Sequence, residues 1–357
     1  MTRLTALRTA LGTAALMIAV ASADGQGAMA GPALLIEPAS GQVLFVDNPD
    51  QTWYPASLTK LMTVYVTFEA IKDGRIKWDD KLALSEKARG QPATRIGLRG
   101  GIALNIEQAV RGLILRSAND FAMALAEGIG GSEEAFATLM NDTAKRLGMT
   151  RSHFKNPHGL PDPEQITTAR DMGILAAALI KDFPDRREVF TTLQVLIHRQ
   201  TFHSQNDLLR TLAGADGMKT GFTCGAGYNV VASATRNGRQ LVAVVLGALT
   251  RTTRSARATE LIEAGFAHLD GKPLPASPSP SAAPLAMLKP VALAEMPMDP
   301  AEATSVHDMS RTTRTRKCGN PSSEPRPVVA KATGKQPVVK AGATKAGAAK
   351  AGPAGSR

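Results

Sequence analysis

A serine and a lysine lie three residues apart in the stretch Pro55-Ala56-Ser57-Leu58-Thr59-Lys60-Leu61-Met62-Thr63, where an apolar run begins. Residues three apart on a helix are neighbours, so the ammonium group of Lys60 can reach the hydroxyl of Ser57. The positive N-terminal end of such a helix would also favour an oxyanion forming beside it. The spacing indicates an activated serine nucleophile, although a capping serine and a solvated lysine would give the same pattern.

The same spacing recurs at Ser152-His153-Phe154-Lys155, so spacing alone does not identify a site. This second copy runs directly into Asn156-Pro157, and the residue before a proline disfavours helix. A rival partner motif at Ser204-Gln205-Asn206 ends only 13 residues before Lys219, which leaves no room for a helical insert between them. These contexts favour the first copy over the second.

The excess of basic residues is concentrated at one end of the chain. Of the formal net charge of +11, residues 271–357 contribute +8, from 13 Lys or Arg against 5 Asp or Glu, so the rest of the chain carries +3. The same stretch holds 13 of the 22 prolines and is rich in alanine. We therefore expect residues 271–357 to form a disordered basic tail, suited to anionic envelope polymers rather than to nucleic acid.

The N-terminus has the pattern of an export signal. Arg3 and Arg8 precede an apolar run over residues 11–21, and small-residue cleavage sites end at Ala23 and Ala30. The run is shorter than the roughly 20 residues that a membrane-spanning helix needs, and no later segment approaches that length. We expect residues 1–30 to be a signal peptide and the mature protein to lie in the periplasm or cell envelope, without a transmembrane segment.

The chain is long enough, with 357 residues of which 43% are hydrophobic, to bury a sizeable core. One α+β domain is predicted over residues 31–270, with strands near both ends and helices between them. Strands are expected over 33–37, 42–47, 228–235 and 241–246, the last two joined by Asn237-Gly238. Helices are expected over 57–71, 104–128 with a break near 116–120, 132–147, 168–181 and about 256–268. This order predicts an antiparallel sheet flanked by helices, with an all-helical insert.

Cysteine and histidine give no sign of a metal site. Cys224 and Cys318 are the only cysteines, and Cys318 falls in the predicted tail, so we expect no structural disulfide. The histidines match no common zinc spacing, and His158 is expected to be structural. We predict neither a metal nor another cofactor.

Three short motifs follow one another: Ser57-Leu58-Thr59-Lys60, Ser117-Ala118-Asn119 and Lys219-Thr220-Gly221. Such a set occurs in penicillin-binding proteins and class A β-lactamases. With the longer strings around them, residues 33–269 resemble the D-alanyl-D-alanine carboxypeptidases, which are low-molecular-mass penicillin-binding proteins with a β-lactamase/transpeptidase-like fold. These longer strings lie at Pro55–Lys60, Asn156–Leu160, Thr168–Met172, Asp216–Thr223 and Ala226–Asn229.

The resemblance implies a role for each motif. Ser57 would attack the carbonyl carbon of the penultimate D-alanine, with Lys60 as the general base, and an acyl-enzyme would form. Ser117 would relay a proton to the leaving amine, and Asn119 would hold a substrate amide. Lys219 would supply positive charge from the opposite wall of the cleft.

The resemblance also implies a substrate-binding wall along Lys219, Thr220, Gly221 and Phe222. The oxyanion hole would use the backbone N–H groups of Ser57 and Phe222. Thr220 and Arg254 would bind the free C-terminal carboxylate of the substrate. Two other arginines lie close in sequence and leave the last assignment open: Arg251 and Arg257.

The function expected from this resemblance is removal of the terminal D-alanine from peptidoglycan pentapeptides, with acylation by penicillins. A D,D-endopeptidase of the same family is the nearest alternative. A class A β-lactamase would need a Glu-x-x-Leu-Asn element between the second and third motifs, which is absent. A non-enzymatic wall-binding protein would not need the serine and lysine together. Many family members also carry a second, β-rich domain and a terminal amphipathic helix, and the sequence indicates neither.

Overall fold

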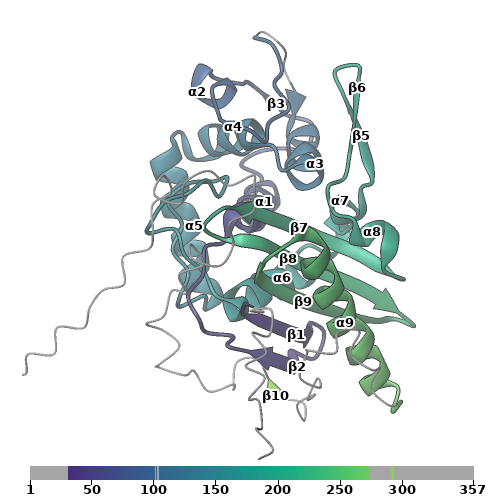
Figure 1. Cartoon of the computed structure of the whole chain (residues 1–357). Coiled ribbons are helices and arrows are strands. Elements are labelled where there is room, and N and C mark those ends of the chain that lie inside the picture. The colour runs from purple at the N-terminus through teal and green to yellow at the C-terminus, as the bar shows by residue number, and fades with distance from the viewer. Residues whose placement is uncertain (1–30, 101, 103, 273–290, 293–357) are drawn as a thin grey trace, which may run out of the picture.

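The computed structural model describes residues 31–100, 102, 104–272 and 291–292, and it places a six-stranded sheet beside a helical lobe (Figure 1). The strand order is β10-β2-β1-β9-β8-β7, and every pairing is antiparallel. The strands are β1 (Ala33–Glu37), β2 (Gln42–Asp47), β7 (Ala215–Thr223), β8 (Gly227–Arg236), β9 (Arg239–Ala248) and β10 (Val291–Ala292). The predicted antiparallel sheet, built from both ends of the domain, is confirmed.

Side chains alternate between the two faces of this sheet, as they must in a β-strand. Leu35 on β1 packs in one cluster with Leu261 and Ile262 of α9 (Arg251–Leu269). Its neighbours Leu34 and Ile36 point to the opposite face, into the larger cluster that contains α1 and α6. Helices therefore cover both faces, and the core has a layer on each side of the sheet.

The longer helices follow the sequence prediction closely. They are α1 (Thr59–Lys72), α3 (Ile106–Arg116), α4 (Asn119–Gly130), α5 (Glu133–Leu147) and α6 (Ala169–Asp182), together with α9. The side chains of Ser132 and Thr168 cap α5 and α6, each accepting a hydrogen bond from a backbone N–H in the first turn. The helix α9 begins five residues before the predicted start, because Thr250 and Thr253 form a capping box there.

The helix α1 lies between the sheet and the helical lobe (Figure 1). Its residues from Thr59 to Phe68 are all buried, including Lys60, Thr63 and Thr67. A helix that is buried all round has no solvent face, so its polar side chains must find partners inside the protein. This position holds the start of α1 at the boundary between the two lobes.

Several short elements had no signal in the sequence. They are η1 (Ala56–Leu58), β3 (Lys81–Leu82), α2 (Glu86–Arg89), β4 (Leu104–Asn105), η2 (Pro184–Arg186), α7 (Glu188–Thr191), β5 (Gln194–Ile197), β6 (Gln200–His203) and α8 (Leu208–Thr211). The strand β10 was also unexpected, since it falls in the predicted disordered tail and pairs with β2 at the edge of the sheet. The predicted signal peptide and the rest of the tail lie outside the described residues.

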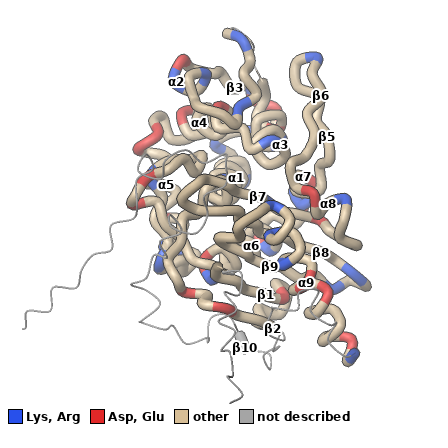
Figure 2. Tube along the Cα trace, viewed as in Figure 1, with Lys and Arg blue, Asp and Glu red and all other residues tan. Residues whose placement is uncertain are grey.

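Two further sequence predictions concern cysteines and charge. Cys224 is disulfide-bonded, so the expectation of no disulfide was wrong; Cys318 lies outside the described residues. Basic and acidic residues are interspersed over both lobes, as expected for a nearly neutral domain (Figure 2). Within the described part of the chain, no helix is both long enough and apolar enough to cross a membrane.

Candidate active site

Ser57 and Lys60 meet where the turn η1 passes into α1. The Nζ atom of Lys60 lies 3.1 Å from Ser57 Oγ. It donates a hydrogen bond to Asn119 Oδ1 at 2.7 Å and another to the backbone carbonyl of His158. The side chain of Lys60 is 0% exposed, so it is not a solvated lysine. Two acceptors thus hold the amine beside the serine hydroxyl.

The surroundings of Lys60 favour its neutral form. Burial lowers its pKa well below the ordinary value, and the nearby charge of Lys219 lowers it further, while Asp120 acts in the opposite direction. A neutral amine can accept the proton of a serine hydroxyl, whereas an ammonium group cannot. The direction of this shift is the one that a lysine general base requires.

Ser117 and Asn119 lie in the break between α3 and α4. Ser117 ends α3 in the left-handed conformation, with φ of 62°, and its buried Oγ has no hydrogen-bond partner among the described residues. Asn119 begins α4, and its Nδ2 donates to the carbonyl of Pro92 at 3.0 Å. Asp120, which the sequence analysis did not single out, accepts a hydrogen bond from the backbone N–H of Gly97 at 2.8 Å. This contact holds the loop around Gly97 against the start of α4.

The strand β7 brings the third motif to the same place. Lys219 is 1% exposed and donates to the carbonyl of Thr220 at 2.8 Å. Burial, followed by the charge of Arg254, lowers the pKa of Lys219 to about 7. A Cβ atom on Gly221 would lie 3.1 Å from the backbone nitrogen of Ser57, so a glycine lets the strand approach the nucleophile.

The wall beyond Gly221 presents an aromatic surface. Phe222 is 40% exposed, and its ring lies 4.2 Å from the ring of Tyr228, centre to centre. A small, open pocket lies beside the turn that carries Ser57. Its lining comes from three segments near the site: Tyr54–Ala56, Gly159–Asp162 with Gln165, and Thr223 with Gly225.

The loop from Asn156 to Leu160 packs under the nucleophile turn. Ala56, just before the serine, has φ of 47°, which is strained for a residue other than glycine. Gly159 has φ of +84°, and a Cβ there would lie 1.9 Å from the carbonyl oxygen of Ala56. Pro157 accepts a hydrogen bond from Thr63 Oγ1 at 2.6 Å. The loop therefore fits closely against both η1 and α1.

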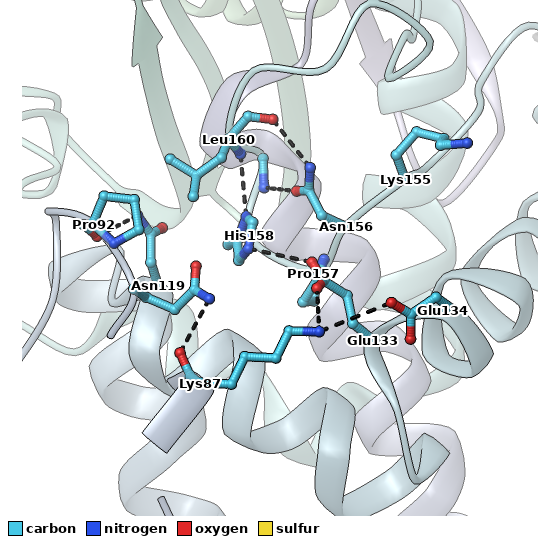
Figure 3. Close-up of polar contacts among 12 residues, drawn as sticks. Lys87, Pro92, Asn119, Glu133, Glu134, Lys155, Asn156, Pro157, His158 and Leu160 are labelled. Carbon is cyan, nitrogen blue, oxygen red and sulfur yellow. Dashed lines mark hydrogen bonds and ion pairs between the residues drawn. The ribbon is translucent and has the colours of Figure 1, made fainter. Parts of the chain in front are cut away.

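Figure 3 shows the imidazole of His158 between Leu160 and Glu133, with Lys87 beyond. Its Nδ1 accepts the backbone N–H of Leu160 at 3.3 Å, and its Nε2 lies 3.6 Å from Glu133 Oε1. Glu133 also pairs with Lys87 at 2.8 Å. Burial, then the charges of Lys60 and Lys87, lowers the pKa of His158 to about 3, so the ring is neutral at physiological pH. No sequence pattern indicated that the carbonyl of His158 would contact Lys60.

Of the three neighbouring arginines, Arg254 is the buried one, with a side chain 3% exposed. Arg251 is exposed, and Arg257 pairs with Glu260 at 3.2 Å. Arg254 lies near enough to Lys219 for its charge to lower the pKa of that lysine. It also pairs with Asp207 at 2.5 Å, a partner that sequence reasoning missed.

The rival serine and lysine are not brought together. Ser152 donates to Asp171 at 2.8 Å, whereas Lys155 pairs with Glu164 at 2.9 Å. Ser204 accepts the backbone N–H of Asn206, a local turn contact. The structure therefore gathers the first set of motifs and leaves the second dispersed.

The sheet with its helical lobe, and a serine held by a buried lysine between them, define the penicillin-binding, transpeptidase-like class of serine proteins. Residues 19–250 match the family described as D-alanyl-D-alanine carboxypeptidase, peptidase S11. The chain belongs to this family.

Individual relatives agree with this assignment. D-alanyl-D-alanine carboxypeptidase DacC of Escherichia coli (strain K12) is 41% identical over 240 residues, which cover 65% of this chain and 60% of the relative. Penicillin binding protein 5 from Haemophilus influenzae matches with a TM-score of 0.64 and 38% identity, covering 67% of this chain and 71% of that one. The matched part thus spans about 60% of the length of the curated carboxypeptidases.

Two further similar proteins are described with a bound penicillin and with an endopeptidase activity. The ampicillin-bound penicillin-binding protein D2 from Listeria monocytogenes has a TM-score of 0.62 and 31% identity, covering 66% of this chain and 97% of that one. A D-alanyl-D-alanine endopeptidase of Escherichia coli (strain K12) is 30% identical over 241 residues, 65% of this chain and 75% of the relative.

Proposed function

We propose that this protein is a serine-type D-Ala-D-Ala carboxypeptidase that removes the terminal D-alanine from peptidoglycan pentapeptides. The observation that carries the proposal is the buried Lys60 amine, 3.1 Å from Ser57 Oγ, with a pKa lowered by burial. Such a pair supplies a nucleophile and its base. Membership of the family and its carboxypeptidase relatives support the same activity.

In the first half of the reaction, Ser57 Oγ attacks the carbonyl carbon of the penultimate D-alanine and Lys60 accepts its proton. The backbone N–H groups of Ser57 and Phe222 stabilise the negative charge on the carbonyl oxygen. Ser117, whose buried hydroxyl has no partner in the described structure, relays this proton from Lys60 to the departing amine of D-alanine, which leaves Lys60 neutral again. An acyl-enzyme on Ser57 results, and water then hydrolyses it with Lys60 again as base.

Substrate recognition uses the two walls of the site. The amide side chain of Asn119 lies beside Lys60 and contacts a substrate amide. The segment of Lys219, Thr220 and Gly221 lies along the peptide, and Thr220 and Arg254 bind the free C-terminal carboxylate. The same groups would receive the carboxylate of a penicillin, which acylates Ser57 in place of the peptide.

The remaining assignments rest on the sequence. The predicted export signal supports a location of the mature protein in the periplasm or cell envelope, where its substrate lies. The basic tail suits anionic envelope polymers. Neither nucleic acid nor a cofactor takes part in the reaction proposed here.

The test is digestion of a purified pentapeptide and of cross-linked muropeptide dimers. We expect release of free D-alanine from the pentapeptide, and no release after Ser57→Ala. A fluorescent penicillin should label the wild-type protein, and mapping of the modified peptide should identify Ser57. Activity in Ser57→Ala equal to wild type, or rapid turnover of penicillin, would contradict the mechanism.

The alternative is a D,D-endopeptidase, which cuts cross-links that lack a free carboxylate at the same place. One observation favours it: the Arg254 guanidinium already pairs with Asp207. The endopeptidase among the relatives supports the same alternative. Cleavage of dimers without release of D-alanine from the pentapeptide would replace our proposal with this one.

A further inference from the structure

Asp207 is an acidic residue that the mechanism does not use, and it lies against the buried arginine of the site. It directly precedes α8, and its carboxylate accepts from Arg254 Nη2 through Oδ1 at 2.5 Å. Ser255 completes a closed set of contacts: its Oγ donates to Asp207 Oδ2 at 2.8 Å and accepts from Arg254 Nη2 at 2.9 Å. The arginine is therefore held from one side by a charge-assisted hydrogen bond.

The pairing uses one nitrogen of the guanidinium group, Nη2, which contacts both Asp207 and Ser255. The Nε atom of Arg254 is buried and has no hydrogen-bond partner within the described part of the chain. The side chain of Arg254 is 3% exposed, and that of Asp207 is 30% exposed. An incoming carboxylate that binds Arg254 would therefore share the guanidinium group with the carboxylate of Asp207.

Two carboxylates that share one guanidinium group repel each other, and the repulsion is strong where water is excluded. A substrate with a free C-terminal carboxylate thus gains less from Arg254 than it would from an unpaired arginine. A substrate in which that carboxylate is amidated, or extended by further residues, does not meet this repulsion.

We propose that Asp207 determines specificity: by holding Arg254, it weakens selection for a free C-terminal carboxylate and lets the site accept substrates in which that group is amidated or extended. This inference rests on the proposed carboxylate-binding role of Arg254. It names a further substrate class that the pair admits, which is the C-terminally blocked D-Ala-D-Ala peptide.

The test compares a D-Ala-D-Ala peptide with its C-terminal amide and uses the ratio of their kcat/KM values. Asp207→Asn keeps the shape of the side chain and removes its negative charge. The acid-over-amide ratio, which is kcat/KM for the free acid divided by kcat/KM for the amide, should therefore rise about tenfold, mainly through a lower KM for the acid. Arg254→Gln should lower the ratio. An unchanged or lowered ratio in Asp207→Asn would overturn the inference, because a residue that only positions Arg254 would have that effect.

A matched control uses another arginine–carboxylate pair. Glu263 lies on α9, as Arg254 does, and pairs with Arg236 at 2.5 Å; neither Glu263 nor Arg236 has a role in the proposed site. Glu263→Gln also removes a carboxylate from an arginine, and its acid-over-amide ratio should stay at the wild-type value. Asp207→Ser provides a second variant should the asparagine protein unfold at a lower temperature than the wild type.

The inference has a readout that does not depend on peptidase activity. The rate of acylation of Ser57 by benzylpenicillin, relative to its methyl ester, reports the same carboxylate preference, and Asp207→Asn should raise it. If the wild type is acylated but releases no D-alanine, the proposed function fails while this comparison still decides the role of Asp207. If D-alanine is released and neither ratio rises in Asp207→Asn, the inference alone fails.

Discussion

In the proposed mechanism the two buried lysines of the site have opposite tasks, although the same physical effect acts on both. Burial lowers the pKa of Lys60 and of Lys219, because a charged amine loses its hydration inside the protein. Lys60 must be neutral to accept a proton, whereas Lys219 must be charged to attract a carboxylate. Each positive charge also makes protonation of its neighbour less favourable. The pair can therefore divide the roles only over a limited range of pH.

This division predicts a bell-shaped dependence of kcat/KM on pH. The acid side reports protonation of Lys60, which removes the base. The alkaline side reports loss of the proton of Lys219, whose pKa in the free protein is about 7. A titration of kcat/KM for a D-Ala-D-Ala peptide between pH 5 and pH 10 would show both limbs, since kcat/KM reflects the free enzyme.

A variant separates the two limbs. Lys219→Arg keeps a positive charge at every accessible pH, because a guanidinium group does not lose its proton in proteins. We expect the alkaline limb to move to higher pH and the acid limb to remain where it is. An alkaline limb that is the same in Lys219→Arg and in the wild type would show that another group causes it.

At the scale of elements, the site depends on how closely the 156–160 loop fits under the nucleophile turn. Gly159→Ala would place a Cβ atom 1.9 Å from the carbonyl oxygen of Ala56, so the loop or the turn must move. The carbonyl of His158 would then leave Lys60. We expect a loss of stability greater than the roughly 1–2 kcal/mol of an unfavourable backbone conformation, and acylation by penicillin at least tenfold slower.

Gly148 provides the matched control for this prediction. It ends α5 with φ of +82°, nearly the same backbone conformation, but a Cβ atom there would meet nothing within 4 Å. In urea unfolding, Gly148→Ala should lower the free energy of unfolding only by the cost of the unfavourable backbone conformation. Its acylation rate should stay at the wild-type value. Equal acylation rates in the two alanine variants would refute the proposed role of the loop.

The same element shows what the sequence could and could not predict. The longer helices and the strands β1, β2, β8 and β9 follow from periodicity, from caps such as Ser132 and Thr168 and from the Asn237-Gly238 turn, because these signals are local. The strand β7, which carries Lys219, was not predicted. Contacts made through the backbone are not encoded in a side-chain pattern. The carbonyl of His158 on Lys60 is one example, and it could be found only after folding had placed residues 98 apart side by side.

The missed acidic residues have a similar explanation. Asp207 lies 47 residues before Arg254, and Asp120 lies 23 residues after Gly97, so neither pair has a helical or strand spacing. The motifs themselves were recognisable because each is a short string with fixed spacing. Sequence reasoning thus identified the groups proposed to act on the substrate, and missed the groups that hold them.

At the scale of the whole molecule, the site lies where the helical lobe meets the sheet. Ser57 comes from η1 and Lys60 from α1. Ser117 and Asn119 come from the helical lobe, and Lys219 comes from the sheet. Bringing two lysines into this boundary costs folding free energy, since both lose water and repel each other. The stability of the protein is therefore expected to be limited by its own active site.

Lys219→Met tests this limit. The wild-type lysine is charged in both folded and unfolded states below about pH 7, so the cost of its burial is full there and declines as pH rises toward the unfolded value of 10.5. The free energy of unfolding of Lys219→Met should exceed that of the wild type by a few kcal/mol at pH 6, and this gain should shrink at pH 9. Each kcal/mol corresponds to roughly 2–4 °C in Tm. Peptidase activity should be lost.

The control Lys155→Met, at an exposed lysine, should show no such gain in stability. A Lys219→Met protein no more stable than the wild type at pH 6 would mean that burial of this charge does not limit stability.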